Sequence, residues 1–434
     1  MFAKETYIAR RAKLKQTIGS GLLLFLGNDE SGMNYADNTY HFRQDSTFLY
    51  FFGLPYAGLS AIIDIDNNRE IIFGDELTID AIVWMGTQPT LKEKSEAAGI
   101  TEVRPFKEIE TYLKNAQQKG QPIHYLPTYR AEHQIKLFQW LGVVPGAEKP
   151  SVPFIMGVVN QRNYKSEEEI AEIEKACIVT ADMHLAAMRT VRPGIRESEV
   201  AAAVAEVAYA NNYELSFPII ATINGQTLHN HDHSNLIKSG DMLLLDAGAE
   251  TEMGYAGDMS STIPADTKFT TRQREIYDIQ VAAHEAAVAA LRPGIPFVDV
   301  YELSCKVIME GLKELGFVKG DPMEAVKAGA HAMFMPCGLG HMMGLDVHDM
   351  ENLGEVWVGY NGQPKSTQFG RKSQRLAIPL EPGFVHTVEP GIYFIPELIE
   401  MWKAENKFAD FINYDKVVTY KDFGGIRNEE DYLI

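Results

Sequence analysis

Five ionisable side chains occur where the surrounding sequence is apolar or rich in glycine. Asp246 follows three consecutive leucines, and Asp258 comes twelve residues later, after the run Gly-Tyr-Ala-Gly. His341 lies in CGLGHMMG, Glu389 in FVHTVEPG and Glu429 in GGIRNEED. A carboxylate in apolar surroundings is costly unless an opposite charge compensates it. We therefore expect a cation where these segments meet.

Divalent metal ions are the simplest compensation for this set. Asp246 and Asp258 can occupy neighbouring antiparallel strands and project from one face. With the two glutamates they carry four negative charges, which two divalent cations cancel. Oxygen donors favour Mn²⁺, and the single imidazole leaves Co²⁺, Fe²⁺ and Zn²⁺ open. Two such ions about 3.5–4 Å apart can hold a hydroxide and polarise a carbonyl.

Each of these residues alone also has an ordinary structural explanation. An aspartate at a strand end commonly forms a turn, and a histidine in a glycine-rich loop is commonly structural. Glu429 lies in an acidic triplet, residues 429–431, which can be solvated surface. The five together favour a metal site. The motifs HExxH, GxSxG and the Walker A loop do not occur in the chain, which disfavours the chemistries they carry.

The elements that must position these residues indicate two domains. Residues 1–157 alternate short apolar runs, such as GLLLFLG, SAIIDID and EIIFGD, with helical segments such as one within residues 101–120. This alternation is typical of an α/β domain. Pro150, Pro153 and Gly157 then mark a boundary. Residues 158–434 form the second predicted domain.

The second domain contains an internal repeat. VRPGIRESEV occupies residues 191–200 and LRPGIPFVDV occupies residues 291–300, so Arg, Pro, Gly, Ile and Val recur at a spacing of one hundred residues. His184 and His284 match upstream of these turns. The repeat predicts a duplicated unit of helix, turn and helix, with a site at its pseudo-two-fold interface.

Composition excludes several classes of function. The formal net charge is −19 without a long basic run, which disfavours nucleic-acid binding. No apolar run approaches the ~20 residues of a membrane span. The apolar run at residues 21–27 is short for a signal peptide, so we expect a core strand. Three scattered cysteines, at positions 177, 305 and 337, favour a reducing, cytoplasmic setting.

In these residues the sequence resembles the pita-bread metallopeptidases, the group of methionine aminopeptidase, aminopeptidase P and prolidase. The ligands of that family run Asp, Asp, His, Glu, Glu, and they match the five residues in order. The spacing between the aspartates is one residue longer than is usual in the family, which an extra hairpin residue absorbs. The resemblance implies a pita-bread α+β catalytic domain with pseudo-two-fold duplication, preceded by a smaller α/β domain.

The N-terminal part narrows the choice within that family. HFRQDSTFLYFFG at residues 41–53 resembles a signature of the creatinase/prolidase N-domain, which methionine aminopeptidase lacks, and creatinase lacks the metal ligands. The segments around His341, Glu389 and Glu429 look most like eukaryotic-type prolidase. The resemblance therefore implies an Xaa-Pro dipeptidase acting on small proline-containing peptides. The alternatives are aminopeptidase P, which acts on longer peptides, and a non-catalytic binding protein, against which the complete ligand set argues.

The resemblance also implies catalytic roles. His229 and His348 match the family's non-ligand histidines, which stabilise the tetrahedral intermediate and bind substrate. Arg427 matches an arginine two residues before the last ligand. Glu389 is expected both to bind metal and to carry a proton to the leaving nitrogen.

Three further positions bear on the substrate. Arg375 falls where prolidase has an arginine for the dipeptide carboxylate, although its sequence RKSQR also fits a solvated basic loop. Cys337 stands where the prolidase branch has a histidine, which leaves the fine specificity open. Trp84 matches an N-domain tryptophan that a partner subunit presents to the site in prolidase, so a homodimer is implied.

Overall fold

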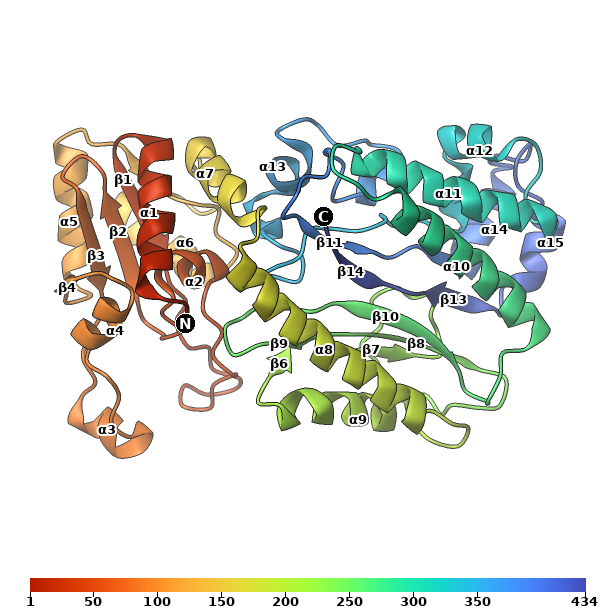
Figure 1. The fold of residues 1–434 in the computed structure, drawn as a ribbon, viewed down its shortest axis with the longest axis horizontal. Helices are drawn as coiled ribbons and strands as arrows, with labels where there is room; N and C mark the ends of the chain where they lie inside the picture. The colour runs from red at the N-terminus through yellow and green to blue at the C-terminus, as the bar shows by residue number, and fades with distance from the viewer. The chain divides into compact units, whose positions relative to one another are not determined.

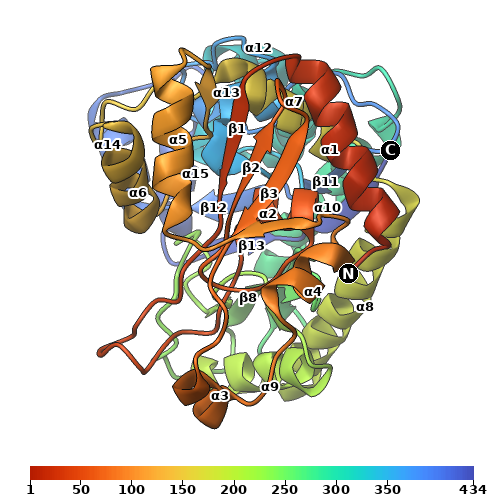
Figure 2. The same ribbon diagram turned by 90° about the vertical axis from the view of Figure 1, so that its left-hand side faces the viewer.

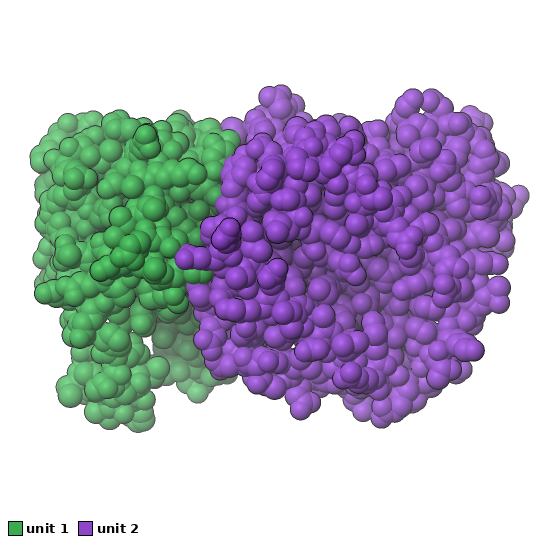
Figure 3. Space-filling view, in the orientation of Figure 1, with its two compact units in different colours: residues 1–162, 352–354 green, residues 163–351, 355–434 purple.

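The computed structural model describes residues 1–434 and divides into two compact units (Figure 3). Unit 1 comprises residues 1–162 and 352–354, and unit 2 comprises residues 163–351 and 355–434. The units therefore divide a few residues after the boundary at 157/158 that the sequence suggested.

Unit 1 is built on a mixed five-stranded sheet in the order β4-β3-β2-β1-β5. Its central strands β1, β2 and β3 are antiparallel neighbours, and β4 and β5 join the two edges in parallel. The three apolar runs expected to be strands form β1, β2 and β3, so the α/β pattern is confirmed. The strands span Leu22–Leu26, Ser60–Asp64, Arg69–Phe73, Glu102–Arg104 and Ile123–His124.

Helices cover both faces of this sheet (Figure 2). Leu113 and Trp140, from α5 and α6, pack against Leu24 and Phe73 on one face. On the other face, Phe25 contacts Phe154 of α7, with ring centroids 5.1 Å apart. Helix α3 has no buried residue. The helices of unit 1 are α1 Lys4–Ile18, α2 Ser46–Phe52, α3 Ile79–Met85, α4 Leu91–Ala97, α5 Glu108–Gln118, α6 Ala131–Leu141 and α7 Val152–Arg162.

Unit 2 contains two pairs of helices that repeat one pattern (Figure 1). Helices α8 (Glu167–Thr190) and α9 (Glu197–Ala210) form the first pair, and α10 (Thr271–Ala290) and α11 (Phe297–Glu314) form the second. Capping boxes start both long helices because Ser166 and Thr270 each exchange hydrogen bonds with the residue three positions later. None of the helices combines the length and the apolar character that a membrane span requires.

The turns inside the two pairs make matching hydrogen bonds. The guanidinium of Arg192 donates to the carbonyl of Thr190 at 3.0 Å, and that of Arg292 donates to Ala290 at 3.0 Å. The next glycines have φ angles of +93° and +87°, a region that favours glycine. Their N–H groups donate to the carbonyls of Ile237 and Leu380. The predicted duplication is confirmed.

Beneath these helices, strands from both halves meet edge to edge. The first half supplies β7, β8 and β10, and the second supplies β11 with β14 and β12 with β13. A bridge between Ser260 and Glu429 joins the halves. Val179 and Met183 of α8 and Val200 of α9 pack on Leu243 and Leu245 of β8. The strands are β6 Glu214–Leu215, β7 Ile220–Thr222, β8 Met242–Ala247, β9 Ala249–Glu250, β10 Met259–Pro264, β11 Val385–Val388, β12 Gly391–Phe394, β13 Gly424–Arg427 and β14 Glu430–Leu433.

The second half also carries long connections between its elements. Residues 315–384 contain helices α12 (Pro322–Ala328) and α13 (Glu355–Tyr360), together with a 3-10 turn η3 at Arg371–Ser373. Residues 395–423 contain α14 (Pro396–Ala404) and α15 (Tyr414–Val417). The first of these connections carries most of the side chains around the candidate substrate pocket.

Candidate metal centre

Asp246 and Asp258 come from a hairpin of the first half. Asp246 lies in β8 opposite Ser260 of β10, and Asp258 precedes Ser260 by two residues. Side chains two residues apart on a strand share a face, and residues directly opposite each other do as well. Both carboxylates therefore project from the same face of the sheet. Both are buried, at 8% and 4% exposed.

Glu429 extends this row across the boundary between the halves. Its backbone pairs with that of Ser260, and the Ser260 hydroxyl donates to Glu429 Oε2 at 2.6 Å. Glu429 is buried, whereas the next residue, Glu430, is exposed. The solvated-surface explanation for the acidic triplet therefore does not hold for Glu429, because alternation along the strand turns it inward.

His341 and Glu389 are set side by side by a segment that has no strand-like sequence. Residues 339–343 run antiparallel to β11, since Thr387 N–H donates to the His341 carbonyl at 3.0 Å and Glu389 N–H donates to Leu339 at 2.7 Å. Gly340 permits this approach, because a Cβ there would lie 2.2 Å from the Thr387 carbonyl oxygen. The pairing fixes His341 and Glu389 as diagonal neighbours.

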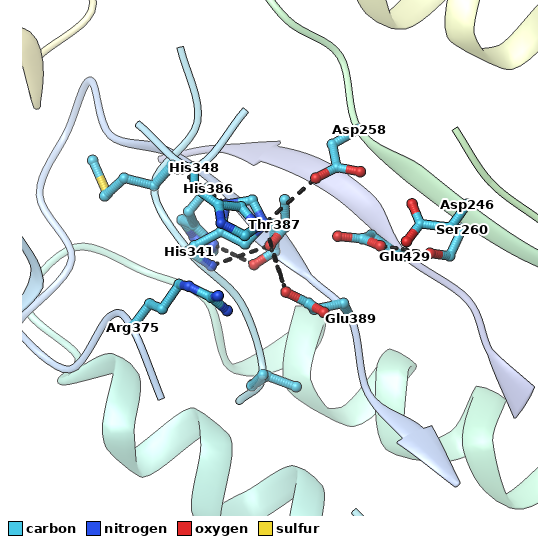
Figure 4. Close-up of polar contacts among 12 residues, drawn as sticks. Asp246, Asp258, Ser260, His341, His348, Arg375, His386, Thr387, Glu389 and Glu429 are labelled. Atoms are coloured by element: carbon cyan, nitrogen blue, oxygen red, sulfur yellow. Dashed lines mark hydrogen bonds and ion pairs between the residues drawn. The ribbon is translucent and has the colours of Figure 1, made fainter. Parts of the chain in front are cut away.

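The side chains of these segments converge (Figure 4). Asp258, His341 and Glu429 offer ligand atoms that all lie within 4.8 Å of one another. His341 Nε2 is 3.4 Å from Asp258 Oδ2 and 3.6 Å from Glu389 Oε1. Asp246 stands beside this group, where its Oδ2 accepts from Arg427 at 2.5 Å. Three of the five expected ligands therefore converge closely, and Asp246 and Glu389 lie beside them.

The electrostatics of the group fit divalent cations. Burial, and then repulsion by neighbouring carboxylates, raise the pKa of Asp258 and of Glu429 well above the usual range. Burial lowers the pKa of His341, which favours the neutral imidazole that binds metal. Asp246 Oδ1 is buried without a hydrogen-bond partner. A cation compensates the charge and gives that oxygen a partner.

Arg427 organises the carboxylates rather than neutralising all of them. It is 4% exposed and donates to Ser260 Oγ at 2.9 Å, to Tyr393 Oη at 3.0 Å and to Asp246. Its Nε also lies 3.8 Å from Glu429 Oε2. These contacts make Arg427 a positioning residue for two of the candidate ligands.

His348 lies against His341, with ring centroids 4.1 Å apart. Its Nδ1 is 2.5 Å from Glu351 Oε2, so this hydrogen bond leaves Nε2 as the nitrogen available to a substrate. Burial, followed by the neighbouring His341, lowers the pKa of His348. His348 is thus a neutral imidazole beside the candidate ligands, with its proton on Nδ1 toward Glu351 and Nε2 available to accept a hydrogen bond.

His229 lies in the loop between β7 and β8, and its side chain is exposed. Neighbouring protein atoms still desolvate it enough to lower its pKa, and the positive charge of Arg427 adds to this effect. The buried Glu197 anchors both ends of the loop, since it accepts from Ile223 N–H at 2.7 Å and from Asn235 Nδ2 at 2.9 Å. The loop that carries His229 is therefore fixed at both ends by the carboxylate of Glu197.

Arg375 and Trp84 occupy different surroundings. Arg375 lines one small cavity with His341 and His348, and its buried Nε has no hydrogen-bond partner. This nitrogen lies 3.4 Å from Glu351 Oε2 and 3.3 Å from Glu355 Oε1. Trp84 belongs to α3 of unit 1 and is 85% exposed.

Cys337 packs beside an apolar cluster that includes Leu244 and Tyr393. Burial raises the pKa of its thiol to about 12. A thiol that stays protonated cannot supply the exchangeable proton of a histidine near neutral pH. If Cys337 stands where prolidase has a histidine, as the resemblance implies, this chain has no group at that position that titrates near neutral pH.

Three polar residues of the site were not found from the sequence. Ser260 could have been found, because strand alternation places it on the face of Asp258. Glu351 lies three residues after His348, a spacing that becomes informative only in the folded loop. Asp431 accepts from Asp258 N–H at 3.0 Å and from the Cys177 thiol at 3.2 Å, and burial raises its pKa to about 7.

Comparisons with known proteins agree with this architecture. Residues 171–434 match the family described as "Metallopeptidase family M24", and residues 7–124 match "Aminopeptidase P, N-terminal domain". The chain is 28% identical to an Xaa-Pro dipeptidase of Homo sapiens, over 98% of this chain and 87% of that protein. It is 32% identical to an Xaa-Pro aminopeptidase of Escherichia coli K12, over 91% of this chain and 88% of that protein.

Solved structures show the same likeness over the whole chain. One is a variant of Escherichia coli aminopeptidase P in complex with substrate, with a TM-score of 0.81 and 28% identity. The match covers 100% of this chain and 93% of the Escherichia coli chain. The other is the proline aminopeptidase P II of Yersinia pestis, with a TM-score of 0.81 and 28% identity. The match covers 100% of this chain and 94% of the Yersinia pestis chain. The expected pita-bread fold, with its separate N-terminal domain, is confirmed.

Proposed function

The chain belongs to metallopeptidase family M24, and on that premise we propose that it hydrolyses Xaa-Pro bonds with two divalent metal ions. The observation that carries the proposal is the convergence of buried carboxylates and one neutral imidazole from both halves of unit 2. The candidate ligands are Asp246, Asp258, His341, Glu389 and Glu429. The names of the relatives, Xaa-Pro dipeptidase and Xaa-Pro aminopeptidase, support the bond that is cleaved.

The donor set supports the choice of metal. Oxygen atoms dominate it, which favours Mn²⁺, with Co²⁺, Fe²⁺ and Zn²⁺ as alternatives because of the single imidazole. When bound, a pair of such ions supplies a hydroxide nucleophile at neutral pH and polarises the scissile carbonyl.

The protein's own groups would handle protons and developing charge. Glu389 is the least buried candidate ligand, and its Oε1 lies 3.5 Å from the Thr387 hydroxyl. A carboxylate there can accept a proton from the nucleophile and return it to the proline nitrogen. His229 would donate to the oxyanion, and His348, whose proton lies on Nδ1, would accept a hydrogen bond from the substrate through Nε2. Arg427 would hold Asp246 and Ser260 in place throughout.

We favour Xaa-Pro dipeptides as the substrates. Arg375 shares a cavity with His348, and its buried Nε lacks a hydrogen-bond partner. The carboxylate of a dipeptide would give that nitrogen a charge-assisted partner. The second candidate is aminopeptidase P activity on longer peptides, which the proximity of Arg375 to Glu351 and Glu355 favours because its charge is already compensated.

Substrate length tests this choice. Removing a hydrogen bond to a charged group costs about 1.5–3 kcal/mol, or about one to two decades in kcat/KM. We expect Arg375→Ala to weaken Ala-Pro turnover by that factor, mainly through KM, and to leave cleavage of the tripeptide Ala-Pro-Ala almost unchanged. A wild type that prefers the tripeptide, together with a silent mutation, would establish aminopeptidase P activity instead.

We also propose a homodimer. Helix α3 presents Ile79, Val83, Trp84 and Met85 to solvent, each at least 66% exposed. Apolar side chains grouped in this way commonly mark an interface. Light scattering of the wild type beside Trp84→Ala tests the proposal, since a monomeric wild type would contradict it.

A further inference from the structure

Arg375 lies in a compact group of charged side chains at the rim of the candidate site. Its Nε is almost equally distant from one oxygen of Glu351, at 3.4 Å, and one oxygen of Glu355, at 3.3 Å. Lys365 forms an ion pair with the other oxygen of Glu355. His348 bonds to the same Glu351 oxygen that faces Arg375. Glu351 and Glu355 thus contact the only arginine that lines the cavity, and each glutamate has a second partner.

The charges of this group cancel. Arg375 and Lys365 contribute two positive charges, and Glu351 and Glu355 contribute two negative ones. The hydrogen bond from His348, and then the charge of Arg375, lower the pKa of Glu351 to about 2, so this side chain is ionised at neutral pH. An anion that enters the cavity therefore finds no uncompensated positive charge, although it does find an unsatisfied N–H on Arg375.

We propose that Glu351 and Glu355 are specificity-determining residues, which compete with the substrate's terminal carboxylate for Arg375 and thereby set how well a free dipeptide is accepted. This inference rests on the proposed Xaa-Pro peptidase function. A carboxylate that binds Arg375 must come close to both glutamates, and like charges in that arrangement repel. A neutral group at the same position, such as the amide of a longer peptide, meets no such repulsion.

The two glutamates differ in a way that separates charge from positioning. Glu355 contacts Arg375 and Lys365, whereas the partner of His348 is Glu351. Glu351 both faces Arg375 and holds His348 through Nδ1. Loss of the charge of Glu351 should therefore change substrate preference, and loss of its hydrogen-bond acceptor should additionally slow catalysis.

The test compares two substrates that differ only in the charge in question, Ala-Pro and its amide, Ala-Pro-NH₂. The quantity measured is the ratio of kcat/KM for the acid to kcat/KM for the amide, with metal-loaded full-length enzyme. In Glu355→Gln and in Glu351→Gln we expect this ratio to rise about three- to fivefold through KM, the scale of one partly exposed ion pair. Glu351→Ala should raise the ratio as well and lower kcat about tenfold or more on both substrates, because His348 loses its anchor.

A matched control lies on the same segment. Arg371, four residues before Arg375, pairs with Glu302 at 2.5 Å and does not line the cavity. Glu302→Gln removes an equivalent charge from an arginine outside the pocket, so the acid-to-amide ratio should stay within twofold of the wild type.

Different results would contradict the role of the glutamates, the peptidase function and the positioning of His348. If both glutamine variants cleave the amide as the wild type does and their ratios move by less than twofold, the glutamates do not set carboxylate acceptance. If the metal-loaded wild type cleaves neither Ala-Pro, its amide nor Ala-Pro-Ala, the Xaa-Pro peptidase function itself is wrong. An equal kcat for Glu351→Ala and Glu351→Gln would contradict the positioning of His348.

Discussion

The two halves of unit 2 share a scaffold and divide the chemistry between them. In the first half, His184 of α8 contacts Ser261 Oγ at 2.8 Å and the Ala247 carbonyl at 3.2 Å. In the second, His284 of α10 contacts Tyr432 Oη at 3.4 Å. Each histidine thus fastens a long helix to the strands of its own half. The scaffold is repeated, but the first half supplies two candidate ligands and the second supplies three.

The clearest difference between the halves is the residue type at the first position of the second helix of each pair. Glu197 starts α9 and Phe297 starts α11, at matching positions of the repeat. Glu197 accepts hydrogen bonds from the loop that carries His229. Phe297 instead packs against His386 of β11, with ring centroids 4.8 Å apart. A polar residue thus holds a loop in one half, and an apolar residue supports a strand in the other. The repeated backbone is kept while the side chains at matching positions differ in role.

Within this comparison, the largest expected effect on activity comes from substituting His348, a residue of the second half. His348 has no place in the proposed ligand set. His348→Ala should keep the bound metal and lose on the order of 10²–10³ in kcat, the scale of one hydrogen bond lost from the transition state. Metal analysis beside steady-state kinetics checks this. Loss of metal from the variant would make His348 a ligand and would contradict the assignment.

The next prediction compares substitutions at the first residues of α9 and α11, Glu197 and Phe297. Phe297→Ala should cost about 3–5 kcal/mol of unfolding free energy, because it leaves a cavity in a packed core. Glu197→Ala should cost about 1–3 kcal/mol, since it leaves buried donors unpaired, and it should also lower kcat by releasing the His229 loop. Urea unfolding and kinetics on both variants test the contrast. The contrast would be contradicted if Phe297→Ala lowered kcat more than Glu197→Ala, with each kcat calculated per folded molecule.

A smaller effect concerns acid sensitivity in the second half. Burial lowers the pKa of His331 to about 4, from about 6.5 in an unfolded chain. Between these values the unfolded chain binds a proton that the native state does not, so stability falls as pH drops from about 6.5 to 4. Each pH unit should cost about 1.4 kcal/mol. His331→Gln should flatten the dependence of unfolding free energy on pH by about that slope, and an unchanged slope would show that His331 titrates normally.

Local signals predicted the elements of this fold well. The strands β1, β2 and β3 are short apolar runs, and the helices α8 and α10 begin at capping boxes that are complete within four residues. The RPG turns were equally readable, because glycine and proline restrict the backbone locally. Convergence of Asp246 and Asp258 followed from alternation along adjacent strands.

Other features depend on pairing between distant segments, which local sequence does not encode. Residues 339–343 read as a glycine loop, yet they form a ladder with β11. Glu389, which follows the apolar residues of FVHTVEPG, lies just beyond the last residue of β11. The ion pairs of Arg375 with Glu351 and Glu355 join residues brought together only by the long connection of the second half. Register across a sheet is set by the whole packed structure, and so it could not be read from either half alone.

Metal stoichiometry tests the central claim most directly. The wild type, stripped with a chelator and reloaded with Mn²⁺ or Co²⁺, should bind two ions per chain and regain Xaa-Pro hydrolysis as they bind. Asp258→Ala, which removes a ligand from the first half, and Glu429→Ala, which removes one from the second, should each bind fewer ions and lose activity. Full hydrolysis by a wild type shown to contain no metal, or unchanged binding of two ions in both variants, would contradict a dinuclear centre shared between the two halves.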